Sequence, residues 1–600
     1  MSEAKRNRYL LVVELIIIAA VTVGLLLGIG AARGDAYLVT RNWPESQLLP
    51  QLETAAPVAD CIATESLSSA ECRFFTSLQG LVNKTRPRIF ISDHFPSSSD
   101  AVPAALHLSF QKQEDPYALV DKYREEIKGV VIYDPAQPAT IHLATVIAAS
   151  QRCVLAEASL ARRLENQWQI PIIQDLRGQF SQAVDVYRFM LENYAESFTN
   201  RLLLGSDPNG TTAYMDYTIA VGAFPVWLNA ADPEEKALLE DYMSRMPAGK
   251  SAYLGDWPDE EAGLSLASQY GVVCLDGAEN LSFYAGLSDH SKETSPNGAD
   301  VFPAYKAENK LYIALIIGNG GLSEGLNEMP ALWTEARNSD LPLSWNLSPA
   351  LRNAAPALWE YYADTAGSAD CFVSPQAGLG NYNPSDWQDR ESLTQMLKRT
   401  DVYIEKMNYA AAFLPEDLSP LQPSSERPGL LEYYRENLPH LSGYVNDRTS
   451  QDLSEALLLS VQNIQSAQEL SDICSQAVAA FDGMAPAYLV LHTPLLSMEI
   501  YESLTARYPD AQFVTVSDCL ALRRGEKASN PLTILPAHIE PRPTVDRSVY
   551  DPYAINAADE TEEAHSPWRY IGAAAISLLC LSAAILQFFL LERARKHRQA

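Results

Sequence analysis

Residues 311–317 read LYIALII, seven apolar residues between the polar segment KAENK and a glycine-rich turn. A short apolar run bounded by turn residues is typical of a strand buried on both faces. Helical segments such as 391–399 and 497–507 separate this run from similar ones. Those other strand-like runs are CFVSP (371–375), AYLVLH (487–492) and QFVTVS (512–517). The alternation predicts parallel α/β layers, arranged either as an α/β barrel or as an open doubly wound sheet.

The region before residue 300 alternates in the same way. Strands are expected at 86–92, 129–134 and 153–156, and helices at 66–84, 116–127, 140–150 and 160–167. We therefore expect an α/β fold, with one or more N-terminal α/β domains followed by a (β/α) barrel-like domain. The expected boundaries are a stalk at 32–65, the N-terminal domain at 66–300, the barrel-like domain at 301–525 and an extended spacer at 526–567.

The N-terminal segment has the character of a membrane anchor. Residues 15–32 carry no charge, and a helix of this length nearly crosses a hydrocarbon core of about 30 Å. Lys5, Arg6 and Arg8 precede it, which places residues 1–8 in the cytoplasm. A cleaved signal peptide is the competing interpretation. The apolar stretch is longer than most signal sequences, so an uncleaved transmembrane helix at 9–31 is preferred.

A second apolar segment lies near the C-terminus. Residues 570–591 contain 22 residues without a charge, preceded by acidic residues and followed by a basic tail at 592–600. The basic flank places this tail in the cytoplasm, and a transmembrane helix is expected at 568–591. The sequence thus predicts a plasma-membrane protein anchored in the bilayer by two helices, with both termini cytoplasmic and its main domains extracytoplasmic.

Composition excludes some classes of function. The chain has 45 basic and 75 acidic residues, a formal net charge of −30, so nucleic-acid binding is not expected. None of the nine histidines forms an HxxxH or HExxH pair, and we expect neither a metal nor another cofactor. Of the eight cysteines, Cys61 and Cys72 are close enough in sequence for a disulfide, although buried thiols are the alternative.

Residues 366–384, AGSADCFVSPQAGLGNYNP, hold the most informative pattern. A strand ends near residue 375 and a loop with two glycines follows, at the edge where α/β folds bind ligands. Gly378 and Gly380 permit a sharp turn or a close approach to a ligand. The loop and its flank also offer flat aromatic faces and directional hydrogen-bonding groups, both suited to a sugar, at Asn381, Tyr382, Asn383, Asp386 and Trp387.

The loop GLGNYNP resembles the defining motif of the GxGYxYP putative glycoside hydrolases. Gly378, Gly380 and Pro384 match, whereas Asn381 and Asn383 stand where the motif has tyrosines. Further similar segments are SLQGLVNKTRPRIFI (77–91), IKGVVIYDP (127–135), DLRGQF (175–180), the long segment 253–286, LPLSWNLSPALRNAAPALWEYY (341–362) and QFVTVSDCLALRR (512–524). The resemblance implies an N-terminal α/β domain and a barrel similar to polysaccharide deacetylases.

One departure bears on the chemistry. The family resemblance implies an acidic Asp-Gly-Asp-Asn-like turn after the first barrel strand, where this chain has Asn319, Gly320, Gly321 and Leu322. Glycoside hydrolysis generally needs two carboxyl groups. The remaining catalytic candidates, each with a structural role as its alternative, are Glu324, Asp386 and His492. Asn319 is a candidate for substrate binding, and Trp345 for a sugar platform or for the core.

Two functions remain open. The first is a putative glycoside hydrolase that acts on a polysaccharide or cell-envelope glycan, as the resemblance and the glycine loop suggest. The alternative is a non-catalytic glycan-binding or envelope-assembly protein on a degenerate hydrolase fold, in which partner proteins of the envelope are expected. The lost acidic turn, the two asparagines in the motif and the two anchors favour this second function.

Overall fold

The computed structural model describes residues 43–94, 102, 105–210, 212, 214–287, 304–414, 430–446, 458–527 and 535, all within one compact unit. The expected transmembrane helices at 9–31 and 568–591 and both expected cytoplasmic ends lie outside these ranges, as does nearly all of the spacer. Within the described ranges, no helix is both long enough and apolar enough to cross a membrane.

The N-terminal region contains three small sheets in which every strand pair is parallel. The first, in the order β2-β1-β3, consists of β1 (Val58–Ala63), β2 (Ile89–Ser92) and β3 (Ser109–Lys112). The second, β5-β4-β6, consists of β4 (Gly129–Ile132), β5 (Cys153–Ala156) and β6 (Ile172–Asp175). The third, β10-β9-β7-β8, consists of β7 (Leu202–Gly205), β8 (Phe224–Val226), β9 (Ser251–Gly255) and β10 (Val272–Leu275).

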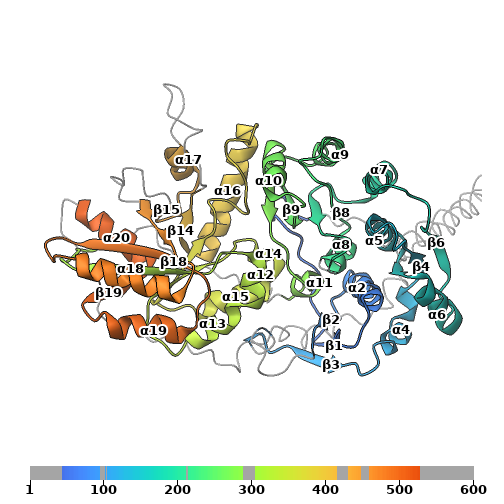
Figure 1. The fold of residues 1–600 in the computed structure, drawn as a ribbon, viewed down its shortest axis with the longest axis horizontal. Coiled ribbons are helices and arrows are strands. Elements are labelled where there is room, and N and C mark those ends of the chain that lie inside the picture. Colours follow the sequence, from blue (N-terminus) through green and yellow to red (C-terminus); the bar gives the residue numbers. More distant parts are fainter. Residues whose placement is uncertain are drawn as a thin grey trace, which may run out of the picture. The chain divides into compact units, whose positions relative to one another are not determined.

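Helices connect these strands, some lying between the sheets and others at the periphery (Figure 1). They are α2 (Ser69–Asn83), α4 (Ala118–Lys122), α5 (Ala139–Gln151), α6 (Ala158–Trp168), α7 (Ala183–Tyr194), α8 (Met215–Val221), α9 (Pro233–Met243), α10 (Glu260–Gln269) and α11 (Leu281–Tyr284), with short 3-10 turns at Arg124–Glu126 and Ala195–Ser197. A capping box of Ser68 and Glu71 begins α2, which explains why the chain turns helical there.

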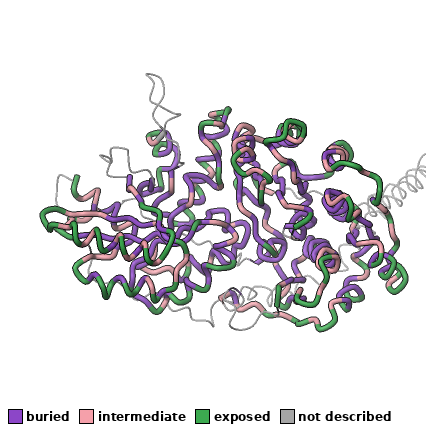
Figure 2. Tube along the Cα trace, in the orientation of Figure 1, coloured by how far each residue is buried: buried purple, intermediate pink, exposed green. Residues whose placement is uncertain are grey.

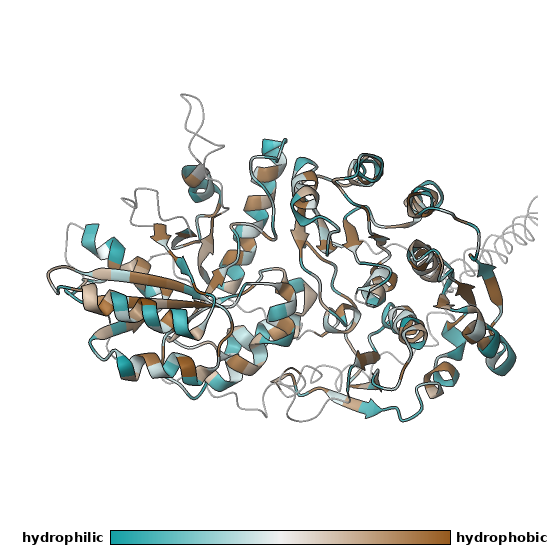
Figure 3. Cartoon of the chain, in the orientation of Figure 1, coloured by the Kyte–Doolittle hydropathy of each residue, from teal (hydrophilic) through white to brown (hydrophobic). Residues whose placement is uncertain are grey.

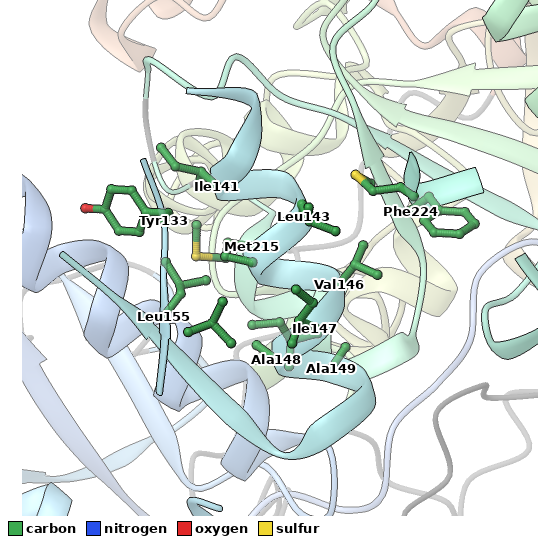
Figure 4. Packing of buried hydrophobic residues seen from close by; sticks show 14 of the residues in the cluster. Tyr133, Ile141, Leu143, Val146, Ile147, Ala148, Ala149, Leu155, Met215 and Phe224 are labelled. Atoms are coloured by element: carbon green, nitrogen blue, oxygen red, sulfur yellow. The ribbon is translucent and has the colours of Figure 1, made fainter. Parts of the chain in front are cut away.

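Helix α5 is the centre of the N-terminal core. It is apolar on all sides, as a helix enclosed by other elements must be. Figure 4 shows its Ile141 and Val146 among side chains that include Leu155, Met215 and Phe224. Because these come from the regions of the second and third sheets, α5 joins those two sheets in one continuous core.

The C-terminal region is a nine-stranded parallel sheet that nearly closes into a barrel. Its strands are β11 (Leu311–Ile317), β12 (Leu343–Asn346), β13 (Asp370–Ser374), β14 (Tyr409–Phe413), β15 (Gly443–Asn446), β16 (Leu458–Ser460), β17 (Gln462–Asn463), β18 (Ala487–Thr493) and β19 (Ala511–Val514). Strands β16 and β17 are separated only by Val461, yet β16 pairs with β15 and β17 pairs with β18. The barrel alternative is therefore the correct one of the two expected arrangements.

Helices cover the outside of the barrel (Figure 1). They are α12 (Leu322–Asn327), α13 (Met329–Ala336), α14 (Leu351–Ala354), α15 (Pro356–Thr365), α16 (Arg390–Met407), α17 (Leu430–Asn437), α18 (Ala467–Ala480) and α19 (Met498–Arg507). Figure 2 shows buried strands behind partly exposed helices, and Figure 3 shows the matching alternation of apolar and polar residues on those helices. Helix α20 (Val516–Lys527) packs Val516, Leu520 and Leu522 into the cluster of side chains formed by the strands.

Most of the strands and helices expected from the sequence are present, and β11 has the expected bounds. The expected stalk is different: from residue 43 onward the segment packs against the domain, since Leu48 and Leu49 are buried and β1 is the central strand of its sheet. Cys61 and Cys72 are both free thiols, so the suggested disulfide is absent.

Candidate functional site

A cavity of about 280 Å³ lies at the carboxyl ends of β11, β12 and β13. We call it the barrel pocket. The loops that directly follow these three strands line it, together with the end of β10. The lining residues are Cys274, Leu275, Asp276, Asn319, Gly320, Gly321, Ser348, Pro349, Pro375, Gln376, Gly378, Leu379, Gly380 and Asn381. Because ligands bind at this edge of parallel barrels, the location alone marks it as the candidate site. Its volume is near the lower end for ligand pockets.

Asp276 is the carboxylate in the lining of the barrel pocket. It follows β10 and accepts hydrogen bonds from the backbone N–H of Leu322 (2.8 Å) and Ser323 (3.0 Å), one to each carboxylate oxygen. These are the first N–H groups of α12, which lack partners within the helix. Burial raises the pKa of Asp276, and the two N–H donors oppose that rise. The N-terminal region thus supplies a carboxylate beside the Asn319–Gly321 turn.

Glu324 lies in the first turn of α12 and folds back under the same turn. Its Oε1 accepts hydrogen bonds from the backbone N–H of Asn319 (2.7 Å) and Gly320 (3.4 Å). The residue is 8% exposed, and burial raises its pKa to about 7. It does not line the barrel pocket, because the Asn319–Gly321 turn lies between. Asn319 itself is exposed in the lining, and its Oδ1 accepts a bond from the Gly321 N–H.

His492 lies near the end of β18, beneath the same turn. Its Nε2 is 2.7 Å from the carbonyl oxygen of Gly318, and its Nδ1 is 3.0 Å from Oδ1 of Asn463. Asn346, at the end of β12, donates from Nδ2 to the Gly318 carbonyl. The ring of Phe413 lies 5.0 Å from the imidazole. These contacts hold the partly exposed His492 beside the Gly318 carbonyl, and it is not one of the lining residues.

The glycine motif fastens the barrel to the N-terminal region. The N–H of Asn381 donates to the Cys274 carbonyl at 2.7 Å, and the Cys274 N–H donates to the Asn381 carbonyl at 2.8 Å. A Cβ on Gly380 would lie 2.7 Å from that Cys274 carbonyl, so a side chain there would break the contact. The edge strand β10 is covered in this way. Among the motif residues 378–384, Asn381 is the exposed one, and it lines the pocket.

The aromatic residues of the motif are buried. Tyr382 is 1% exposed and its hydroxyl contacts the carbonyl of Ala377 (2.9 Å) and the hydroxyl of Tyr434 (2.7 Å). Trp387 packs edge-on against Tyr382 and donates to the Ser392 hydroxyl. A ring with no free face cannot stack on a sugar. In this conformation both residues hold the loop, and neither offers the sugar platform that the sequence suggested.

Three further candidates lie away from the pocket. Asn383 donates from Nδ2 to the Asp386 carboxylate at 3.1 Å, and the pair forms a turn outside the lining. Trp345 is fully buried, and its indole N–H donates to the Asp370 carboxylate at 2.8 Å. The structure therefore brings together Asn319, Gly378, Gly380 and Asn381, but places Asp386 and Trp345 elsewhere.

Sequence reasoning missed Asp276. A signal was present, because Asp276 directly follows the apolar run VVCL, and the residue after such a strand lies at the ligand-binding edge. It was overlooked since its strand belongs to a different sheet from the motif. Among the described residues, no group of three or more His, Cys, Asp or Glu side chains could hold a metal ion.

The fold and pocket define a class: an α/β protein in which a nearly closed parallel barrel carries a ligand pocket at the carboxyl ends of its strands. Three domain models match the chain. They are the GxGYxYP_N second domain over residues 127–198, the GxGYxYP third domain over 200–286 and the GxGYxYP putative glycoside hydrolase C-terminal domain over 309–501. The chain therefore belongs to the GxGYxYP putative glycoside hydrolase family.

A solved structure from Bacteroides thetaiotaomicron, described as a putative hydrolase, has the same fold. It matches with a TM-score of 0.66 and 17% sequence identity, over 81% of this chain and 98% of that chain. Curated proteins give no significant match to the sequence.

Proposed function

We propose that the protein binds a polysaccharide or cell-envelope glycan, with one sugar residue seated in the barrel pocket, and that it does so without cleaving it. The observation that carries this proposal is that no acidic side chain is both in the lining and free of backbone hydrogen bonds among the described residues. Asp276, the carboxylate in the lining, already accepts a backbone hydrogen bond at each oxygen. Glu324 is covered by the Asn319–Gly321 turn, and Asp386 lies outside the lining.

The lining suits the hydroxyl groups of a sugar. The side-chain amides of Asn319 and Asn381, both exposed, supply donors and acceptors of fixed direction. Gln376 and Ser348 also line the pocket but are buried, and Nε2 of Gln376 donates to the Tyr382 carbonyl. Pro375, which is partly exposed, supplies apolar surface for the C–H groups of a ring. A ligand with alternating polar and apolar surface, such as a pyranose, matches this mixture.

Hydrolysis is the second candidate, and the pKa of Glu324 favours it. A carboxyl group with a pKa of about 7 retains its proton near neutral pH, as a general acid must. Movement of the Asn319–Gly321 turn would expose this acid. It would then protonate the glycosidic oxygen as the C–O bond breaks, while Asp276 takes a proton from the attacking water.

Binding is tested with two asparagines that lie two positions apart. Asn381→Ala removes an amide from the lining but keeps the backbone bridge to Cys274. Asn383→Ala removes an amide outside the pocket. Isothermal titration across a panel of glycans should show about 5–30-fold weaker binding for Asn381→Ala, the loss of one or two hydrogen bonds, and wild-type binding for Asn383→Ala. Equal affinities for both variants and the wild type would contradict the placement of the ligand.

We also propose that residues 9–31 and 568–591 anchor the protein in the plasma membrane, with residues 32–567 extracytoplasmic. The uncharged length of both segments and their basic flanks support this topology. A cysteine substituted for Ala600 should resist an impermeant thiol reagent in intact cells and react after lysis. Labelling of intact cells at that position would contradict the cytoplasmic location of the C-terminus.

A further inference from the structure

A second cavity, of about 270 Å³, lies in the N-terminal region, and we call it the inter-sheet pocket. Its walls are the segments that follow four strands: β1 and β2 of the first sheet, and β7 and β10 of the third. The lining residues are Thr64, Leu67, Ser69, Cys72, Arg73, Thr76, Gln79, Ile91, Ser92, Asp93, Gly210, Thr212, Tyr214, Asp216, Glu279 and Asn280. Parallel sheets bind ligands outside the carboxyl ends of their strands, and here two sheets direct those ends to one cavity.

The two sheets are held together at this cavity by Asn280. Its Nδ2 donates to the Ile91 carbonyl at 2.7 Å, and its Oδ1 accepts from the Ile91 N–H (3.1 Å) and from Nε2 of Gln79 (2.7 Å). Asn280 has φ +56°, and nearby Tyr214 has φ +68°. A left-handed conformation is costly for an aromatic residue and persists only where the surroundings enforce it. The hydrogen bonds of Asn280 therefore connect β2 and α2 to the segment that follows β10.

Two polar side chains in the lining, Thr76 and Arg73, bear on what a ligand would meet. Thr76 is 6% exposed, and its hydroxyl forms no hydrogen bond with another described residue. Arg73 rests with its guanidinium 5.9 Å from the centre of the Tyr133 ring and forms no salt bridge with a described residue. A polar group that faces a cavity without a protein partner is hydrogen-bonded by water or by a ligand. A ligand in the cavity would supply that hydrogen bond.

The charges in the lining indicate the kind of ligand. Asp93, Asp216 and Glu279 contribute three carboxyl groups against the single guanidinium of Arg73. Asp216 is 2% exposed and is held by the N–H of Ser282 at 3.0 Å. Burial raises the pKa of Asp216 and of Glu279, which favours their neutral forms. Acceptor oxygens still outnumber the single guanidinium, so hydroxyl and ammonium groups suit this lining better than an anion does. The remaining lining is mostly hydroxyl and amide groups, which recognise other hydroxyls.

We propose that the inter-sheet pocket is a second, independent ligand site that takes a single sugar ring without negative charge, and takes an amino sugar best. The barrel pocket and the inter-sheet pocket lie at opposite ends of the segment 276–280. Asp276 lines the first, and Glu279 and Asn280 line the second. The lining sets do not overlap, so each site can be changed without removing a residue of the other.

Saturation-transfer NMR on the full chain tests the proposal with glucosamine, glucose and glucuronate, three probes of one ring size and different charge. We expect affinity to fall in that order. Thr76→Val keeps the side-chain shape and should weaken glucosamine binding about fivefold or more. Glu279→Gln, at the exposed rim, should reduce the preference for glucosamine over glucose.

The matched control is Asn383→Ala, which lies outside both linings and should leave glucosamine binding at the wild-type level. The proposal is overturned if none of the three sugars binds, if glucuronate binds as well as glucosamine, or if Glu279→Gln and Thr76→Val both bind like the wild type. A loss in Asn381→Ala alone would assign the sugar to the barrel pocket and equally overturn it.

Discussion

Replacing Glu324 with glutamine should stabilise the protein at neutral and alkaline pH. Both hydrogen bonds to this side chain, from the N–H of Asn319 and Gly320, end on Oε1. A glutamine keeps an acceptor oxygen at that position, so Glu324→Gln preserves the support of the turn. The change removes only the ability to ionise in a site that is 8% exposed.

The magnitude follows from the pKa of Glu324, which burial raises from an ordinary value of 4.5 to about 7. At about 1.4 kcal/mol per pKa unit, this difference corresponds to ~3 kcal/mol. Because the folded pKa is the higher one, the folded state binds the proton more tightly than the unfolded state. That stabilisation is fully present below pH 4.5 and is lost as the pH rises through about 7.

Urea unfolding followed by tryptophan fluorescence at several pH values measures the effect. The free energy of unfolding of Glu324→Gln minus that of the wild type should rise by up to ~3 kcal/mol between pH 4.5 and pH 8. Asp386→Asn, a matched carboxyl-to-amide change outside the pocket, corrects for general charge effects. A difference that does not change with pH, or that falls as the pH rises, would refute the buried position of Glu324.

Three further changes test the turn and the motif. Asp276→Ala removes the acceptor for two N–H groups of α12 and should destabilise the protein by about 1–2 kcal/mol in urea unfolding; no change would show that α12 does not need this cap. Gly320 has φ +79°, and the Cβ of an alanine there would lie 2.4 Å from the Cβ of Pro375. Gly483 has a similar φ of +72°, but the Cβ of an alanine there would meet no atom within 4 Å. Gly320→Ala should therefore cost about 1–3 kcal/mol more, and equal melting temperatures would argue against the clash. Tyr382→Phe removes a buried hydroxyl that has two hydrogen-bond partners and should lower the free energy of unfolding by about 1–2 kcal/mol. An unchanged denaturation midpoint would contradict this prediction.

The fold could be predicted in large part from local patterns. The run at 311–317 is bounded by polar residues and glycines, and β11 occupies it without a shift. Closure of the barrel could not be predicted, because it depends on β16 and β17, two very short strands that pair on opposite sides. The packing of residues 43–65 was also missed, since single buried leucines in a polar segment have no periodicity.

The candidate site was predicted only where it follows directly from strand ends. Asn319 and Asn381 come after β11 and β13 and do line the barrel pocket. Burial of Tyr382 depends on Tyr434, which is 52 residues away in the sequence, and no local signal reveals it. Asp276 contacts the segment after β11 but follows a strand of a different sheet. The carboxylate of the pocket therefore depends on a contact between segments that are distant in the sequence.

The most direct test of the proposed function measures binding and cleavage in one sample. The purified chain is incubated with each glycan of the panel, and complex formation is followed beside the release of reducing ends. We predict saturable binding of at least one glycan, weakened in Asn381→Ala, with no reducing ends above background. Release of reducing ends that is lost in Glu324→Gln and kept in Asp386→Asn would contradict it and establish hydrolysis with Glu324 as the acid.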